Sequence, residues 1–154
     1  MRRKHQRGMT LVELIVSFTL LALLTTMAVP LARYRVRRDR ERELRYALRE
    51  MRTAIDRYKD LADRGQLGTL SVDSDGYPET LDMLVEGVKP TGTIDKKIRF
   101  LRRIPRDPMT NAYEWGMRST RDDPKSTSWG GGNVFDVFTK STDKAGDGTP
   151  YSEW

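Results

Sequence analysis

The chain has 154 residues, enough for one domain of ordinary size, and 32% of them are charged against 37% that are apolar. It holds no cysteine and a single histidine, His5. This excludes disulfides and disfavours cysteine or histidine zinc sites, histidine-based triads, and with them a classical hydrolase or oxidoreductase. The net charge is +6, but residues 1–8 supply four of these charges, so the basic character is not the footprint of a nucleic-acid site.

The N-terminus joins a basic leader to a long apolar run. Residues 1–8 read MRRKHQRG. The 24 residues from Met9 to Ala32 would form a helix of about 36 Å, which spans a hydrocarbon core of about 30 Å. Basic residues before such a run orient the N-terminus toward the cytoplasm. Two simple interpretations are a cleaved signal peptide, with Thr26 and Ala28 before the cut, and an ordinary single-pass anchor.

Neither interpretation accounts for Glu13, which stands directly before the uncharged stretch Leu14 to Ala32. A carboxylate inside an apolar span costs about 2.5–3.5 kcal/mol on insertion scales, so we expect it to have a partner. If the chain is cut after Gly8, Met9 becomes the first residue and Glu13 the fifth. The new α-amino group and the carboxylate can then each pair with the opposite charge on a neighbouring copy. That spacing predicts subunits with a defined axial offset.

Residues 33–64 predict one long amphipathic helix that continues the apolar run. Pro30 is expected to kink or loosen this helix without ending it, and Gly65 is a natural C-terminal stop. The charged run 33–42 mixes both signs just outside the apolar span, which favours a solvated face or headgroup contact over nucleic-acid binding. The apolar positions recur at steps of four and three and predict one buried face: Leu44, Leu48, Met51, Ile55, Tyr58 and Ala62.

The last 90 residues alternate loops with short elements. Residues 77–85 predict a short helix that ends at Gly87. Alternating polarity predicts strands within residues 113–117 and 133–139, and the serine- and glycine-rich stretch 120–132 between them predicts a loop. We expect these pieces to cover the apolar stripe of the long helix.

Residues 8–15, GMTLVELI, resemble the processing motif of type IV pilins and pseudopilins. That motif is a basic leader, a glycine, a hydrophobic residue, and then T-L-V-E opening an apolar helix. The resemblance implies cleavage between Gly8 and Met9 by a prepilin peptidase, N-methylation of Met9, and a role for Glu13 in assembly. Pro30 falls where many members carry a helix-kinking proline. Storage in the membrane before assembly into a helical filament is also implied.

The C-terminal part resembles the major pseudopilin of type II secretion systems, the G-type. The matching segments are Tyr77-Pro78 with Leu81 and Leu84, residues 104–113, residues 136–143, and the closing Trp154. Met109-Thr110 and Ser141 depart from the family pattern.

This resemblance implies an α+β, type IV pilin-like fold, with a long N-terminal helix packed on a small C-terminal antiparallel β-sheet domain. The expected organisation is a leader at 1–8, a transmembrane or filament-core helix at 9–32, and its amphipathic continuation at 33–64. A periplasmic globular domain at 65–154 completes the chain.

Residues 143–148 form a loop with the composition of a metal site. It offers Asp143 and Asp147 among glycines, and calcium takes six to eight oxygen ligands, many of them backbone carbonyls. In the G-type pseudopilins this loop resembles a structural calcium site. The resemblance implies Asp143 as a side-chain ligand, with Asp147 and the carbonyls of Val137 and Lys140 as further ligands. The alternative is a solvated turn with two exposed aspartates.

The function implied is that of a structural subunit, not an enzyme. It would polymerise into a periplasmic pseudopilus that drives export of folded proteins across the outer membrane. The implied partners are further copies, minor pseudopilins, the prepilin peptidase, the inner-membrane assembly platform with its ATPase, and the lipid bilayer, with no nucleic acid. Before assembly the chain would cross the inner membrane once.

Two alternatives stay open at this point. One is a pilin of a type IV pilus serving adhesion, motility or DNA uptake, which the missing cysteines disfavour because many major pilins close a C-terminal loop with a disulfide. The other is an unprocessed membrane enzyme, which the lack of a catalytic constellation disfavours.

Overall fold

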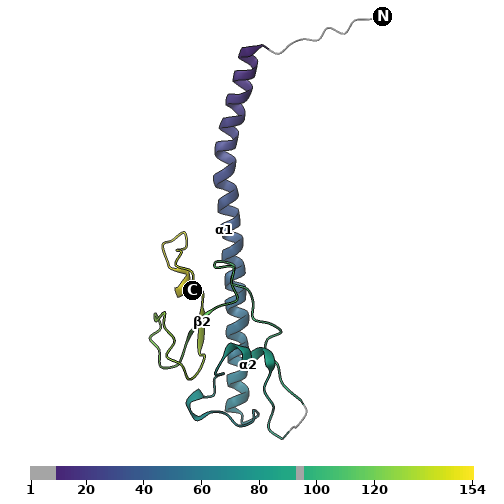
Figure 1. Cartoon of the computed structure of the whole chain (residues 1–154), viewed down its shortest axis with the longest axis vertical. Coiled ribbons are helices and arrows are strands. Elements are labelled where there is room, and N and C mark those ends of the chain that lie inside the picture. The colour runs from purple at the N-terminus through teal and green to yellow at the C-terminus, as the bar shows by residue number, and fades with distance from the viewer. Residues whose placement is uncertain (1–9, 93–95) are drawn as a thin grey trace, which may run out of the picture. The chain divides into compact units, whose positions relative to one another are not determined.

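One helix dominates the chain in the computed structural model, which describes residues 10–92 and 96–154 apart from the side chains of Met27 and Ala28. This helix, α1, runs over Leu11–Asp63 and is the coiled ribbon from purple to blue in Figure 1. The chain divides into two compact units, Met1–Asp39 and Arg40–Trp154, and α1 contributes to both.

Both ends of α1 carry recognisable caps. At the start, the hydroxyl of Thr10 accepts a hydrogen bond from the backbone N–H of Glu13 at 3.3 Å, the geometry of an N-cap residue and its third helical residue. At the end, Gly65 has φ +65° and donates to the carbonyl of Ala62, while Gln66 donates to that of Leu61. These two bonds make a Schellman motif, and the left-handed conformation explains why glycine ends the helix.

In the first unit, α1 leaves its apolar residues uncovered. Every described side chain from Leu11 to Leu31 is exposed, and an 18-residue window here has a mean hydropathy of 2.2. Each hydroxyl side chain in this stretch donates to the backbone carbonyl four residues earlier, as Ser17 does to Glu13 at 2.7 Å and Thr19 to Ile15 at 2.8 Å. Their polar atoms are thus satisfied within the helix, as a lipid environment requires. By length and composition this helix is able to cross a membrane.

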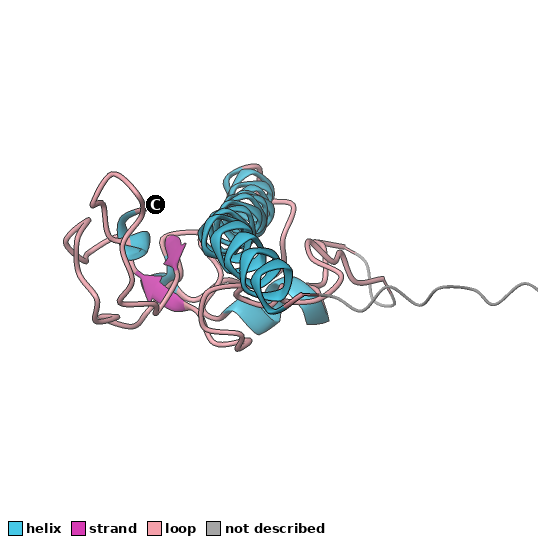
Figure 2. Cartoon of the chain, turned by 90° about the horizontal axis from the view of Figure 1, so that it is seen from above, coloured by secondary structure: helices cyan, strands magenta, loops and turns pink. Residues whose placement is uncertain are grey.

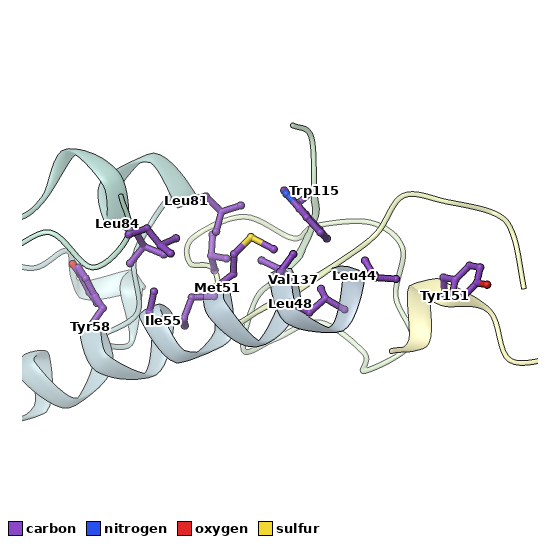
Figure 3. Packing of buried hydrophobic residues seen from close by; sticks show 14 of the residues in the cluster. Leu44, Leu48, Met51, Ile55, Tyr58, Leu81, Leu84, Trp115, Val137 and Tyr151 are labelled. Atoms are coloured by element: carbon purple, nitrogen blue, oxygen red, sulfur yellow. The ribbon is translucent and has the colours of Figure 1, made fainter. Parts of the chain in front are cut away.

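In the second unit, α1 buries the predicted apolar stripe. Leu44, Met51 and Ile55 are 0% exposed, and Figure 3 shows this row of side chains pointing toward the rest of the unit. The core is built around it from α2 and the strands, and full burial of such side chains stabilises a fold by roughly 1.5–3 kcal/mol each. Other fully or nearly fully buried members include Leu48, Tyr58, Leu84, Val134 and Val137.

Helix α2 spans Leu81–Glu86 and covers the C-terminal end of this stripe. Leu81 and Leu84 are buried as predicted, and Figure 3 shows them above Met51, Ile55 and Tyr58. The sequence predicted a start at residue 77, but Thr80 is extended, with φ −142° and ψ 158°, so the helix begins after it. Gly87 ends the helix as predicted, with φ +82°.

The sheet is a single antiparallel pair, β1 at Gly116–Arg118 and β2 at Asp136–Phe138. Gly116 faces Phe138, Met117 faces Val137, and Arg118 faces Asp136. A side chain at Gly116 would place its Cβ 2.3 Å from the Phe138 ring, so glycine there lets the ring lie across the partner strand. Both strands are shorter than predicted: Tyr113, at the expected start of the first, is 65% exposed and lies outside the pair.

When the chain is viewed along the helix, the strand pair lies on one side of α1 and loops flank the helix on both sides (Figure 2). The predicted α+β, pilin-like class with a long N-terminal helix and a small antiparallel sheet is therefore confirmed.

Candidate functional site

The predicted processing site, Gly8 and Met9, lies outside the described residues. The description begins at Thr10, and Glu13 sits in the first turn of α1 with an exposed side chain. Thr10 and Glu13 have the T-x-x-E spacing of a capping box, and the backbone bond between them is present. A carboxylate in the first turn also complements the partial positive charge of a helix N-terminus. The T-L-V-E motif thus has a local structural role in addition to the predicted role of Glu13 in assembly.

Pro30 lies inside α1, and the helix continues through it as predicted. Proline has no N–H, so the helical hydrogen bond to the carbonyl of Thr26 is missing. The hydroxyl of Thr26 itself donates to the carbonyl of Ala22 at 2.8 Å. This part of the helix therefore has one backbone bond fewer than its surroundings.

The predicted calcium loop is a turn with two exposed aspartates. The backbone carbonyl of Asp143 accepts a hydrogen bond from the backbone N–H of Tyr151 at 3.1 Å. The backbone N–H of Ala145 donates to the carbonyl of Thr149 at 2.8 Å. The carboxylate of Asp147 accepts the backbone N–H of Thr149 at 2.9 Å, which lowers the pKa of Asp147 below its ordinary value. Exposed carboxylates in a turn are oxygen ligands of the kind that hard cations take. Within residues 10–92 and 96–154, no three acidic or histidine side chains converge as a metal-ligand group.

The two predicted carbonyl ligands are placed differently. Val137 is 0% exposed, and its carbonyl accepts a hydrogen bond from Nη2 of Arg52 at 3.2 Å. A calcium ion on that oxygen would lie close to a guanidinium, and the two positive charges would repel. Lys140 is exposed and its ammonium group pairs with Glu114 at 3.2 Å. The structure therefore does not fit a cation to the carbonyl of Val137, and it leaves Asp143 and Asp147 as two exposed carboxylates of one turn.

Arg52 binds three groups from the C-terminal part of the chain. Its Nε lies 2.7 Å from Oδ1 of Asp136, and its Nη2 lies 2.7 Å from the carbonyl oxygen of Trp154 and 3.2 Å from that of Val137. Charge-assisted bonds of this kind are the stronger class of protein hydrogen bonds. One side chain of α1 thereby connects strand β2 to the last residue.

A second arginine completes this arrangement. Arg118 is 5% exposed and donates to the other oxygen of Asp136 at 3.2 Å and to the carbonyl of Ser152 at 3.0 Å. Its guanidinium also lies over the ring of Phe138 at 4.1 Å. We call Arg52, Arg118 and Asp136 the arginine clasp. Two guanidinium groups have more N–H donors than one carboxylate can accept. Backbone carbonyls accept hydrogen bonds from the remaining N–H groups.

Aromatic contacts extend the arginine clasp. The guanidinium of Arg45 lies 4.3 Å from the centre of the Trp154 ring, and Tyr151 meets the same ring edge-on at 4.9 Å. The hydroxyl of Tyr151 donates to Glu41 at 2.7 Å. The C-terminal residues are thus held on α1 by charge, ring stacking and hydrogen bonds.

Sequence reasoning missed the arginine clasp. Arg52 is one of many arginines on a charged helix, so its position alone carries no signal. The available signal was Asp136, an acidic residue in a strand between the buried Val134 and Val137. A half-buried carboxylate in such a place calls for a cationic partner.

Asp107 is a second residue whose role the sequence did not predict. It is 0% exposed, and its carboxylate accepts the hydroxyls of Thr139 at 2.5 Å and Thr110 at 3.0 Å and the backbone N–H of Met109 at 2.8 Å. Asn111 follows with φ +61°. Met109 and Thr110, which depart from the family pattern, are therefore fixed by Asp107, and Asn111 supplies the left-handed turn.

A family model for the prokaryotic N-terminal methylation motif matches residues 3–29. The match covers the basic leader, the predicted cleavage site and most of the exposed apolar part of α1. It supports the interpretation of Gly8, Met9 and Glu13 as a prepilin-type motif over both a cleaved signal peptide and an ordinary anchor.

Three curated relatives cover most of the chain, and each is named type II secretion system core protein G. The Pseudomonas aeruginosa protein is 29% identical over 75% of this chain and 76% of its own length. The Klebsiella michiganensis protein is 28% identical over 74% and 75%. The Vibrio cholerae protein is 27% identical over 96% of this chain and 90% of its own length. No solved structure matches the chain significantly. The resemblance to the G-type pseudopilins is thereby confirmed, and the chain is a relative of core protein G.

Proposed function

We propose that this relative of core protein G is a structural subunit of a type II secretion pseudopilus. One observation carries the proposal. The described apolar part of α1 is exposed on all sides, while a single carboxylate, Glu13, stands in its first turn. Such a helix needs lipid before assembly and other helices after it. The role is mechanical and not catalytic, in keeping with relatives named as core proteins of a secretion system.

The proposed sequence of events begins at the leader. A prepilin peptidase cleaves between Gly8 and Met9 and methylates the new α-amino group, while the chain crosses the inner membrane once with residues 65–154 in the periplasm. An assembly platform and its ATPase then move the helix from lipid into a filament, which minor pseudopilins accompany. In that filament Glu13 pairs with the amine of Met9 on a neighbouring copy. Growth of the filament drives folded proteins across the outer membrane.

Charge and capping at Glu13 are separable by mutation. Glutamine also fits the capping box, so Glu13→Gln keeps the local helix start and removes only the charge, whereas Glu13→Ala removes both. If pairing with Met9 drives assembly, we expect both variants to insert into the membrane and both to reduce filament yield at least tenfold. The measurement is filament yield in sheared fractions of cells that hold the full secretion machinery. Normal filaments from Glu13→Gln would limit the residue to a capping role.

Mass spectrometry of the mature N-terminus tests the processing step. We expect the chain from native membranes to begin at N-methylated Met9. A chain that starts at Met1, or one that is cut near Ala28, would contradict prepilin processing.

For the loop at residues 143–148 we propose a calcium ion bound by Asp143 and Asp147, with the carbonyl of Lys140 as a further candidate ligand. Bound calcium would cross-link the loop and restrict it in the folded state. The support is the pair of exposed carboxylates in one turn. We expect EDTA to lower the melting temperature of the detergent-solubilised chain and added calcium to restore it. An unchanged melting curve, together with no calcium by elemental analysis, would exclude the site.

A further inference from the structure

The second unit carries two segments of opposite charge that follow each other in the chain. Residues 71–86, the acidic segment, contain five acidic and no basic residues. Residues 96–106, the basic segment, contain six basic and no acidic residues. All of these charged side chains are exposed. The acidic ones are Asp73, Asp75, Glu79, Asp82 and Glu86, and the basic ones are Lys96, Lys97, Arg99, Arg102, Arg103 and Arg106.

The two segments do not neutralise each other within one chain. Backbone bonds between Val88 and Ile98, at 3.0 and 2.9 Å, bring their near ends together. Nevertheless, among the residues that the structure describes, no ion pair within 4.0 Å joins an acidic side chain of the first segment to a basic side chain of the second. In particular, Glu79, Glu86, Arg102 and Arg103 form no ion pair there. Glu79, Glu86, Arg102 and Arg103 are therefore available to a partner, whereas Asp73 pairs with Arg121 of the loop between the strands at 3.8 Å.

The segments lie at different heights along α1. The acidic segment flanks its last turns: the ammonium of Lys59 donates to the carbonyl of Asp75 at 3.0 Å, and burial and the charge of Glu79 raise the pKa of Tyr58. The basic segment runs back along the helix, as the teal-green chain after α2 does in Figure 1. Arg102 and Arg103 there line a recess of about 450 Å³ against residues 43–50 of α1. The acidic segment thus contacts α1 near residues 58–59 and the basic segment contacts it near residues 43–50. The centres of these two contacts are about a dozen residues apart on the helix, or about 18 Å at 1.5 Å per residue.

The recess also offers apolar contact surface. Tyr46 and Tyr113 border it and are 70% and 65% exposed. Exposed tyrosines beside arginines are the residue types that carry much of the energy of protein interfaces. Glu43 and Glu50 on α1 line the same recess, so they moderate its positive charge without reversing the charge of the basic segment.

We propose that the acidic segment of one copy of this chain docks on the basic segment and tyrosine-bordered recess of the next copy along a filament. The proposal rests on the proposed filament function and names the contact between its globular units. A surface that joins two different patches, displaced along one axis, repeats head to tail and does not close on itself, which is the condition for a filament. Opposite charges also fix which copy docks where, because like charges at a wrong register repel.

A charge-swap experiment in the full chain tests this contact. Arg102→Glu with Arg103→Glu reverses the basic segment, and Glu79→Lys with Glu86→Lys reverses the acidic one. Each double variant is expected to lower the yield of sheared filaments at least tenfold, since like charges then face each other. The combination of all four changes is expected to recover filaments to within about threefold of the wild-type yield, because complementarity returns in the opposite sense.

The control is Lys125→Glu, which reverses one exposed charge in the loop between the strands and lies in neither segment. Arg121 in the same loop is kept, because it pairs with Asp73 of the acidic segment at 3.8 Å. Lys125→Glu is expected to leave filament yield within about twofold of wild type. Melting temperature and cellular level of each variant report on folding. The contact would be overturned if both double variants gave wild-type filament yields. It would also be overturned if the variant with all four substitutions gave a filament yield as low as that of either double variant. Absence of filaments from the wild-type chain itself would instead overturn the proposed function.

Discussion

The two units use the same helix in opposite ways. In residues 11–31 the described side chains of α1 are exposed all round and largely apolar, whereas in residues 44–58 a charged helix buries one apolar stripe under its own chain. Both stretches belong to one continuous helix. What differs is what covers the apolar side chains. The second unit covers its own with α2 and the strands, and we propose that lipid, and later other copies, cover those of the first unit. The proposed self-association therefore involves the part of the helix that its own chain leaves uncovered.

Cavity-forming substitutions are expected to show the largest difference between the two parts. Ile55 is 0% exposed, so Ile55→Ala should lower the free energy of unfolding of the second unit by about 2–5 kcal/mol. Leu21 is 62% exposed, and Leu21→Ala should change that value by less than about 0.5 kcal/mol. Urea unfolding in detergent measures both. Equal losses would show that the first part of α1 is covered by its own chain.

The arginine clasp is the next feature by size of effect. Arg52→Ala removes the bonds to Asp136, Val137 and Trp154, and the half-buried carboxylate of Asp136 then loses one of its two cations. We expect a loss of about 1–3 kcal/mol in the free energy of unfolding.

The control for this change is Arg49→Ala, an exposed arginine one turn earlier, with an expected effect below about 0.5 kcal/mol. The same urea titration serves for both variants. If the two substitutions cost the same, the C-terminal residues do not depend on the arginine clasp.

The smallest expected effect is that of low pH on the loop around Asp122, at the surface of the second unit. Asp122 accepts the backbone N–H groups of Ser119 at 2.7 Å and Gly130 at 3.0 Å, and these bonds lower its pKa below the ordinary 3.8. A carboxyl group whose pKa is lower in the folded state stabilises the fold at pH values above its pKa in the unfolded state. This contribution is lost as the pH falls through its pKa in the folded state.

Hydrogen exchange of the peptide covering residues 119–132 measures this loss, after correction for the intrinsic pH dependence of exchange. Protection should fall below about pH 4 in the wild-type chain. Asp122→Asn should lack the protection that the ionised carboxylate provides at every pH. The fall in protection below about pH 4 should therefore be absent in this variant. A fall that persists in the variant would assign it to another carboxyl group.

The sequence predicted the parts of the fold that follow from periodicity. The spacing of Leu44, Leu48, Met51, Ile55 and Tyr58 located the buried stripe, and Gly65 and Gly87 located two helix ends, because each depends on local geometry. The strands were predicted in the right places but too long, since Tyr113 alternates with buried residues without reaching the partner strand.

Long-range polar contacts could not be predicted in this way. Arg52 and Asp136 are 84 residues apart, and nothing local distinguishes Arg52 from the arginines around it. The carbonyl of Val137 was predicted as a calcium ligand by resemblance alone, and its bond to Arg52 depends on a tertiary contact that no motif encodes. Glu13 shows a related limit: its sequence position fits both a cap and an assembly residue, and the charge-only substitution is what separates them.

The position of Trp154 has a practical consequence. Its indole ring lies beneath the guanidinium of Arg45 and against Tyr151, whereas Trp115 is buried with its indole N–H on the carbonyl of Pro105 and Trp129 is 39% exposed. The three rings therefore occupy three optically distinct environments. With Trp115 and Trp129 replaced by phenylalanine, the emission of Trp154 becomes a label-free optical reporter of the C-terminal segment. Any release of that segment from α1 during the proposed assembly is then measurable in real time, by light alone.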